Sequence, residues 1–264
     1  MNPITILVTL LILSILVVSH EFGHFIAARK TGVFVEEFAI GMGPKLFSRQ
    51  GKETLFSIRL LPIGGFCKMR GEEQELDEDG NYLPLDPNKT IDERSFEAKT
   101  KGQKLLILVA GSAMNIIFAW ICLLVLAILV GNTNPLDILK LAFINTANFA
   151  GLIFQSFAML FSGQAGLNDV AGPIGMVSMV DTFMNSGFVS LLAFTALISV
   201  NLGVINMMPL PALDGGRVLI ILIEMITRKK FSPEIEGRIN FVGFVLLMGL
   251  AVVIAFNDIM RLSV

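Results

Sequence analysis

The stretch His20-Glu21-Phe22-Gly23-His24 lies within an apolar run that is long enough to cross a membrane. No charged residue occurs at positions 3–19, and a basic pair at 29–30 follows the motif. On a helix, positions 20 and 24 share one face, so both imidazoles point the same way. They supply half of a tetrahedral zinc site, and the glutamate between them is placed to act as a general base. Because ionisable groups at membrane depth are costly, this cluster indicates function rather than packing.

The composition is that of an integral membrane protein. Of 264 residues, 54% are hydrophobic and only 16% are charged. The net charge of −2 gives no indication of a nucleic-acid partner. Two cysteines, Cys67 and Cys122, do not suggest a disulfide framework and are interpreted as packing residues. The N-terminus lacks the basic region of a cleavable signal peptide, and its apolar run carries the metal motif, so we expect it to be retained.

Hydropathy predicts an all-α polytopic membrane protein in which residues 1–264 form a single transmembrane core. Four membrane helices are expected, at about 4–28, 105–130, 191–208 and 241–257. The segment 136–162 is apolar but interrupted by polar residues, which favours an amphipathic segment on the membrane surface. A fifth span there is the alternative.

The polar region 31–103 contains the pattern of a β-hairpin. Residues 38–44 resemble a glycine-punctuated loop, 54–60 alternate like a strand, and 66–69 resemble a returning strand after a turn at 62–65. The apolar tip is suited to dip into the membrane, and an unpaired edge is suited to take up an extended peptide. An ordinary surface hairpin is the alternative. The acidic run at 72–79 is expected to be a solvated loop.

Charge distribution predicts the orientation of the spans. With four spans, 18 of the 20 Lys and Arg residues fall in the first and third loops, at 29–104 and 212–240. The positive-inside rule then places both loops in the cytoplasm and both termini outside. The first and third helices run in the same direction, so the histidines and Asp214 reach the same cytoplasmic end. Asp214 is therefore the leading third ligand, with Glu224 and Glu236 as rivals.

The end of the third span is unwound by Pro209 and Pro211, which lack backbone N–H groups. Non-helical backbone at membrane depth indicates a site that faces protein or water. A catalytic zinc ion needs three protein ligands and one open position. Asn115, a polar exception in the second span, and Asn206 are candidates to hold the substrate backbone or an oxyanion.

Several motifs together give the chain its resemblance to a known family. It resembles the site-2 protease family of intramembrane zinc metalloproteases, in particular the bacterial branch that includes the regulator-of-sigma-E protease. The matching segments are His20 to His24, Gly41 to Leu46, Leu61 to Met69, Gly111 to Asn115, Gly172 to Gly175 and Asn206 to Gly216.

The resemblance implies a Zn²⁺ cofactor held by His20, His24 and Asp214, with Glu21 as the catalytic base. It also implies a membrane-associated β-hairpin over 54–69 that contacts substrate. The expected substrate-binding residues are Asn115, Asn206, Pro209, Gly64 and Gly65. The implied substrates are single-span membrane proteins such as anti-sigma factors, or signal-peptide remnants, in a bacterial plasma membrane. The active site is expected near the cytoplasmic leaflet.

The chain departs from this branch in one respect. PDZ domains are common between the second and third spans, yet residues 131–190 are short, largely apolar and poor in strand patterns, so no PDZ domain is expected there. Two alternatives stay open: a membrane zincin of another lineage, whose third ligand would usually be a glutamate, and a non-catalytic relative that binds membrane helices or carries metal. The intact Glu21 argues against the second alternative.

Overall fold

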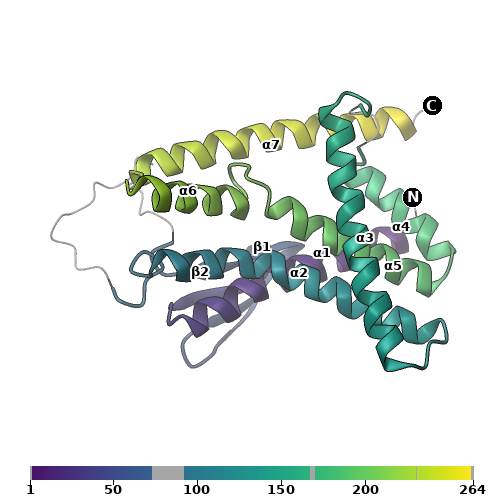
Figure 1. Ribbon diagram of the computed structural model, residues 1–264, viewed down its shortest axis with the longest axis horizontal. Helices are drawn as coiled ribbons and strands as arrows, with labels where there is room; N and C mark the ends of the chain where they lie inside the picture. Colours follow the sequence, from purple (N-terminus) through teal and green to yellow (C-terminus); the bar gives the residue numbers. More distant parts are fainter. Residues whose placement is uncertain (1, 73–91, 167–169, 230, 263–264) are drawn as a thin grey trace. The chain divides into compact units, whose positions relative to one another are not determined.

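A computed structural model describes residues 2–72, 92–166, 170–229 and 231–262, and the chain is mostly helical (Figure 1). Its elements are α1 (Pro3–Lys30), β1 (Val35–Gln50), β2 (Leu55–Met69), α2 (Lys101–Leu129), α3 (Pro135–Phe161), α4 (Pro173–Asn185), α5 (Phe188–Asn206), α6 (Asp214–Thr227) and α7 (Pro233–Leu262). They form two compact units. Unit 1 comprises Met1–Leu16, Met114–Asn206 and Phe244–Val264, and unit 2 comprises Val17–Ala113 and Met207–Gly243. All but the first residue of the predicted acidic loop at 72–79 lies outside the described residues.

Each of the four expected membrane helices is present, as α1, α2, α5 and α7. The largest difference in boundaries is at α7, which begins at Pro233, eight residues before the predicted start at 241. Its first turns carry Glu234 and Glu236, so hydropathy does not detect them, while proline is well tolerated at the first position of a helix. The short helices α4 and α6 were not predicted.

The predicted number of four spans is not confirmed. Five helices are long and apolar enough to cross a membrane: α1, α2, α3, α5 and α7. The additional one is α3, which covers the segment predicted to be interfacial and is the least apolar of the five.

The predicted β-hairpin region is present as β1 and β2, and the chain reverses direction where the turn at 62–65 was predicted. Residues 55–58 and 65–68 of β2 both pair with residues 37–40 of β1, but in opposite directions, so β2 turns back between these two parts, near Gly64 at φ +80°. β1 also reverses between Ile40 and Phe47, which both pair with Ile58, and Gly41 at φ +86° begins this reversal in the expected loop at 38–44. A further tight turn lies at 51–54, where the Gly51 N–H donates to the Thr54 carbonyl at 2.9 Å. The register pairs Val35 with Met69 and Gln50 with Leu55.

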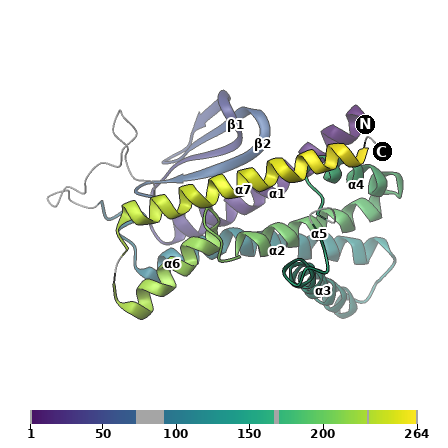
Figure 2. The same ribbon diagram turned by 90° about the horizontal axis from the view of Figure 1, so that it is seen from above.

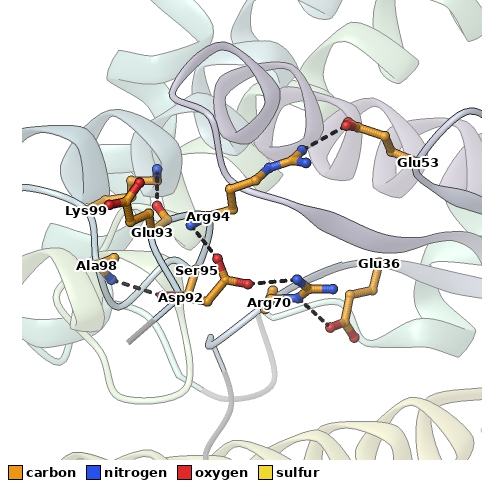
Figure 3. Close-up of polar contacts among 9 residues, drawn as sticks. All are labelled: Glu36, Glu53, Arg70, Asp92, Glu93, Arg94, Ser95, Ala98 and Lys99. Carbon is orange, nitrogen blue, oxygen red and sulfur yellow. Dashed lines mark hydrogen bonds and ion pairs between the residues drawn. The ribbon is translucent and has the colours of Figure 1, made fainter. Parts of the chain in front are cut away.

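Ion pairs fasten the base of the hairpin to the segment that precedes α2 (Figure 3). The Arg70 guanidinium donates to Asp92 at 2.7 Å and also lies 3.5 Å from Glu36 of β1. Arg94 reaches Glu53 in the hairpin turn at 3.0 Å. Both guanidinium groups also stack over the Phe34 ring, at 4.2 and 5.0 Å. Because several charges share partners, this network fixes the hairpin more firmly than isolated surface pairs do.

The apolar core of unit 2 joins the end of α1 that carries the His-Glu-x-x-His motif to the hairpin and α2. Its buried members are Ala27, Ala28, Val33, Val35, Phe38, Cys67, Met69, Phe96, Ile107 and Leu108, and α6 adds Val218 and Ile221 at its border. Three rings pack edge-on or tilted against Phe38 of this core: Phe22 and Phe25 of α1 and Phe56 of β2. The hairpin is therefore packed directly against the helix that carries the histidines.

Within unit 1, α3 lies across α5 rather than alongside it, as both views show (Figures 1 and 2). The two helices share a core that includes Ala142 and Ile153 of α3 and Ala196 and Val200 of α5. A second feature of unit 1 is Asp258 of α7, which is buried. Its carboxylate accepts the backbone N–H groups of Gly172 and Gly175 at 3.3 and 2.9 Å and so caps the start of α4.

Candidate metal centre

Three potential metal-ligand atoms converge in unit 2. His20 and His24, buried on one face of α1, place their Nε2 atoms 3.1 Å apart. Asp214, the first residue of α6, has its Oδ2 atom 3.0 Å from Nε2 of His20 and 3.2 Å from Nε2 of His24. Ligand atoms about 2.0–2.1 Å from a tetrahedral zinc ion are themselves about 3.3 Å apart. The triangle is therefore close to the size that zinc requires.

The arrangement of hydrogen-bond donors and acceptors in this cluster also favours a bound cation. Nδ1 of His24 lies 2.9 Å from the Ile107 carbonyl of α2, which can only accept a hydrogen bond. In a neutral ring, Nδ1 then carries the proton and Nε2 presents a lone pair to Asp214. Oδ2 of Asp214 is buried and receives no hydrogen bond from the described residues. Acceptor atoms facing one another in a buried site repel unless a metal ion lies between them, so the donor set fits zinc.

Glycines bring α1 and α2 close enough to form this cluster. A Cβ atom on Gly23 would lie 2.2 Å from the Ala110 carbonyl oxygen, so a side chain there would push α2 away from α1. A Cβ atom on Gly111 would lie 2.4 Å from Nε2 of His24. The Ile107 carbonyl therefore reaches His24 only because both positions lack side chains, and the imidazole is held in one orientation.

The position of Asp214 depends on the loop before it. That loop packs on Gly215 and Gly216 of α6, where a Cβ atom would lie 2.2 Å from the Met208 carbonyl oxygen and 2.3 Å from that of Leu210. Ala212 adopts φ +68°, an uncommon conformation for a residue with a side chain. Its N–H donates to the side-chain oxygen of Asn240 in α7 at 3.3 Å. Asp214, the predicted third ligand, is thus placed by a tight and locally strained turn.

Glu21 lies between the two histidines in sequence and next to β2 in space. A Cβ atom on Gly65 would lie 3.8 Å from Cγ of Glu21 and 2.7 Å from the Ala39 carbonyl oxygen. Burial raises the pKa of the nearby Cys67 thiol far above its usual range, and the negative charges of Glu21 and Glu72 add to this increase. The structure therefore brings Gly65, one of the predicted substrate-binding residues, to the proposed general base.

The rival ligands lie elsewhere. The Glu224 carboxylate pairs with Lys101 at 3.3 Å and accepts the Phe231 N–H at 2.9 Å. Glu236 lies 3.9 Å from Arg217. Among the described residues, the only group of three or more His, Cys, Asp or Glu side chains spaced to share a metal ion is His20, His24 and Asp214.

The remaining predicted site residues lie in different parts of the structure. Gly64 belongs to β2, and Pro209 belongs to the loop that precedes Asp214. Asn115 and Asn206 belong to unit 1, whereas the metal cluster belongs to unit 2. Asn115 is fully buried, and its backbone carbonyl accepts a hydrogen bond from Ser199 at 2.7 Å. A role for either asparagine at the metal stays a prediction.

Apolar helices of membrane-spanning length and a His-His-Asp cluster define the class as a membrane metalloenzyme. The family model of peptidase family M50 matches residues 8–250. The chain belongs to this family, the site-2 proteases, and is a zinc metalloprotease.

Relatives align over nearly the whole chain. A protein of Clostridium acetobutylicum is 30% identical, with 98% of each chain covered. The zinc metalloprotease RasP of Shouchella clausii is 28% identical, with 98% of this chain and 99% of the relative covered. The regulator of sigma-W protease RasP of Bacillus subtilis is 25% identical, with the same coverage. These alignments run over 347, 414 and 416 residues, so the relatives contain segments that this chain of 264 residues lacks.

Sequence reasoning missed the residues that position the ligands. Gly23, Gly111 and the Ile107 carbonyl act through helix contacts that no spacing rule reveals. Asn240 and Arg217 form hydrogen bonds with Ala212 and Glu72, respectively, which are far from them in sequence. The only available signal was the double glycine that follows Asp214, which indicates close backbone packing without identifying its partner.

Proposed function

We propose that this zinc metalloprotease cleaves peptide bonds in or near the transmembrane segments of single-span membrane proteins or signal-peptide remnants. The observation that carries the proposal is the convergence of His20 Nε2, His24 Nε2 and Asp214 Oδ2 within 3.2 Å of one another, with both histidines on an apolar helix. These three side chains hold the metal, and Glu21 is the catalytic residue. The relative named regulator of sigma-W protease supports anti-sigma factors as one substrate class.

Zinc bound by three protein ligands acts as a Lewis acid that acidifies water and polarises a carbonyl group. The chain's own residues then handle the protons. Glu21 takes a proton from the attacking water and returns it to the leaving amine. Glu21 is half-buried, which limits its contact with bulk water and strengthens this electrostatic control. Asn115 and Asn206 are proposed to hold the substrate backbone.

The substrate is proposed to bind as an extended strand beside β2. A peptide bond in a membrane helix is hydrogen-bonded internally and must be unwound before attack. Extension onto the hairpin supplies replacement backbone hydrogen bonds. Gly65 lies next to Glu21, so a strand laid along this part of the hairpin presents its peptide carbonyls to the general base.

The site is proposed to lie near the cytoplasmic leaflet, with both termini outside and α3 on the outer membrane surface. The metal cluster requires α1 and α5 to end on the same side. If α2 and α3 both crossed, α5 would end on the opposite side, and α4, with 13 residues, is too short to compensate. An α3 that does not cross removes the conflict and leaves the Lys and Arg residues on the cytoplasmic side.

The surface of α3 supports the same topology. At 100° per residue, its exposed polar residues form a stripe opposite the side that packs on α5. The stripe comprises Asp137, Lys140, Asn148 and Gln155, and the packed side includes Ala142, Thr146 and Ile153. Exposed apolar residues flank the stripe, as in helices that lie in the membrane interface. Labelling of single cysteines at Asn148 and Gln155 by a membrane-impermeant reagent should succeed from outside intact cells.

Cleavage of a model transmembrane substrate tests the proposed activity. Purified wild type and Glu21→Gln are compared with zinc measured in both. We expect equal zinc content and cleavage only by wild type, because the glutamine keeps the size of Glu21 but cannot accept a proton. Equal cleavage by both proteins would refute the mechanism.

A further inference from the structure

Arg217 of α6 lies one helical turn after Asp214 and contacts three other parts of unit 2. One guanidinium nitrogen lies 2.5 Å from the carboxylate of Glu72, in the turn that follows β2. Nε lies 3.9 Å from Glu236 at the start of α7. The guanidinium also lies 5.3 Å from the centre of the Phe96 ring, in the segment before α2. One side chain therefore connects the third-ligand helix to the hairpin, to α7 and to the approach to α2.

The Arg217–Glu72 pair is shielded from solvent. Their side chains are 22% and 18% exposed, whereas the members of the Arg70–Asp92 pair at the hairpin base are 41% and 44% exposed. Shielded, hydrogen-bonded ion pairs hold their geometry more strictly than exposed pairs, and removing one partner leaves an uncompensated charge.

Glu72 is hydrogen-bonded to the end of the strand that lies beside Glu21. Its N–H donates to the carbonyl of Met69, the last residue of β2, at 3.3 Å. The same strand carries Gly65, which packs next to Glu21. Arg217 thus joins the helix that supplies a metal ligand to the strand that flanks the general base.

Apolar contacts alone do not fix this relationship. Val218 and Ile221 of α6 pack at the border of the core that contains Cys67 and Met69 of β2. Such contacts are non-directional and permit small sliding movements. A guanidinium–carboxylate hydrogen bond is directional and defines the distance between its two elements.

We infer that Arg217 and Glu72 form a positioning pair that sets the register of a substrate strand on the hairpin relative to the metal ligands. The inference rests on the proposed function, because it assumes that substrate binds along the hairpin. It assigns neither residue a contact with the reacting atoms. Its consequence is that the pair determines which peptide bond of a bound strand faces Glu21.

The test compares Arg217→Met, Glu72→Gln and the double variant on one model transmembrane substrate, with product ends mapped by mass spectrometry. We expect wild-type zinc content, a fall in kcat/KM of about tenfold or more, and cleavage at shifted or additional positions, since small misplacements are costly for catalysis. The double variant should be no worse than the more impaired single variant, because each single change already removes the same Arg217–Glu72 ion pair.

Lys101→Met is the matched control. It removes the ion pair between Lys101 of α2 and Glu224, which lies at the opposite end of α6 from Asp214 and Arg217. It should leave both rate and cleavage position unchanged. Arg217→Lys, which keeps the charge, should retain the wild-type cleavage position, and thermal unfolding identifies any variant that fails to fold. If Arg217→Met does not accumulate, Glu72→Gln carries the test.

Cleavage at the wild-type position in both single variants, at any rate, would overturn the inference. A slower reaction without a change of position indicates that the pair only stabilises the fold. If Glu21→Gln cleaves as well as wild type, the proposed function fails instead, so the two failures are distinguishable.

Discussion

Two aspartates, the half-buried Asp214 in unit 2 and the buried Asp258 in unit 1, show how the same side chain serves different purposes. Asp258 accepts two backbone N–H groups at the start of α4, so its charge is stabilised by protons that point toward it. Oδ2 of Asp214 faces Nε2 of both histidines, and a neutral His24 that donates Nδ1–H to the Ile107 carbonyl presents a lone pair to it. Protons therefore complete the first site, and a bound cation is proposed to complete the second. Burial of a carboxylate alone does not distinguish the two.

Replacing each aspartate by asparagine should separate the two roles and gives the largest expected effect. Asp214→Asn should lose zinc affinity by more than about a hundredfold, since loss of even an outer partner of a metal ligand commonly costs 10–100-fold. Asp258→Asn should keep its zinc and lose about 1–2 kcal/mol of stability, because the amide group matches the two N–H donors poorly.

Zinc analysis and thermal unfolding of both variants check this prediction. The comparison fails if Asp258→Asn loses zinc or if Asp214→Asn retains it. Glu224→Gln extends the test, because zinc loss in that variant alone would move the third ligand away from Asp214.

Two glycines, one beside His24 in the metal cluster and one beside Asp258, provide the next test. A Cβ atom on Gly111 would lie 2.4 Å from Nε2 of His24, and one on Gly172 would lie 2.6 Å from Oδ2 of Asp258. Gly111→Ala should reduce zinc content sharply, because the methyl group displaces a ligand atom. Gly172→Ala should lower the melting temperature and leave zinc unchanged. Metal analysis of the purified proteins distinguishes these outcomes, and wild-type zinc in Gly111→Ala would contradict the close helix contact.

A third carboxylate, Glu37 of β1, extends the comparison to a charge held by hydrogen bonds from side chains, and its expected effect on stability is smaller. Partial burial by itself would raise the pKa of Glu37, but hydrogen bonds from Ser57, Arg59 and Lys45 outweigh it and hold the pKa below its usual range. A lowered pKa in the folded state contributes stability above the unfolded pKa, about 4.3, and this contribution is lost as the pH falls through the folded value.

Glu37→Gln should therefore lose part of the stabilisation that wild type has at neutral pH. The difference in melting temperature between the two proteins should shrink as the pH is lowered from 7 toward 3. A difference independent of pH would show that Glu37 contributes through packing rather than through its charge.

Much of the metal site could be predicted because its first residues are local in sequence. His20 and His24 share a helix face by spacing alone, and the charge distribution predicted Asp214 near them, which is where the structure places it. Helix boundaries were harder to predict from the sequence. Hydropathy does not detect the polar first turns of α7.

The sequence by itself determined the class of protein, since an apolar helix that contains His-Glu-x-x-His requires a compensating cation and belongs in a membrane. It also determined which residue types were available as ligands. Only the tertiary structure decided how those ligands are held. The Ile107 carbonyl, Asn240 and the Arg217–Glu72 pair act across distances of 28 to 145 residues. Such contacts depend on how close two backbones approach, and that distance is set by packing in three dimensions rather than by periodicity along the chain.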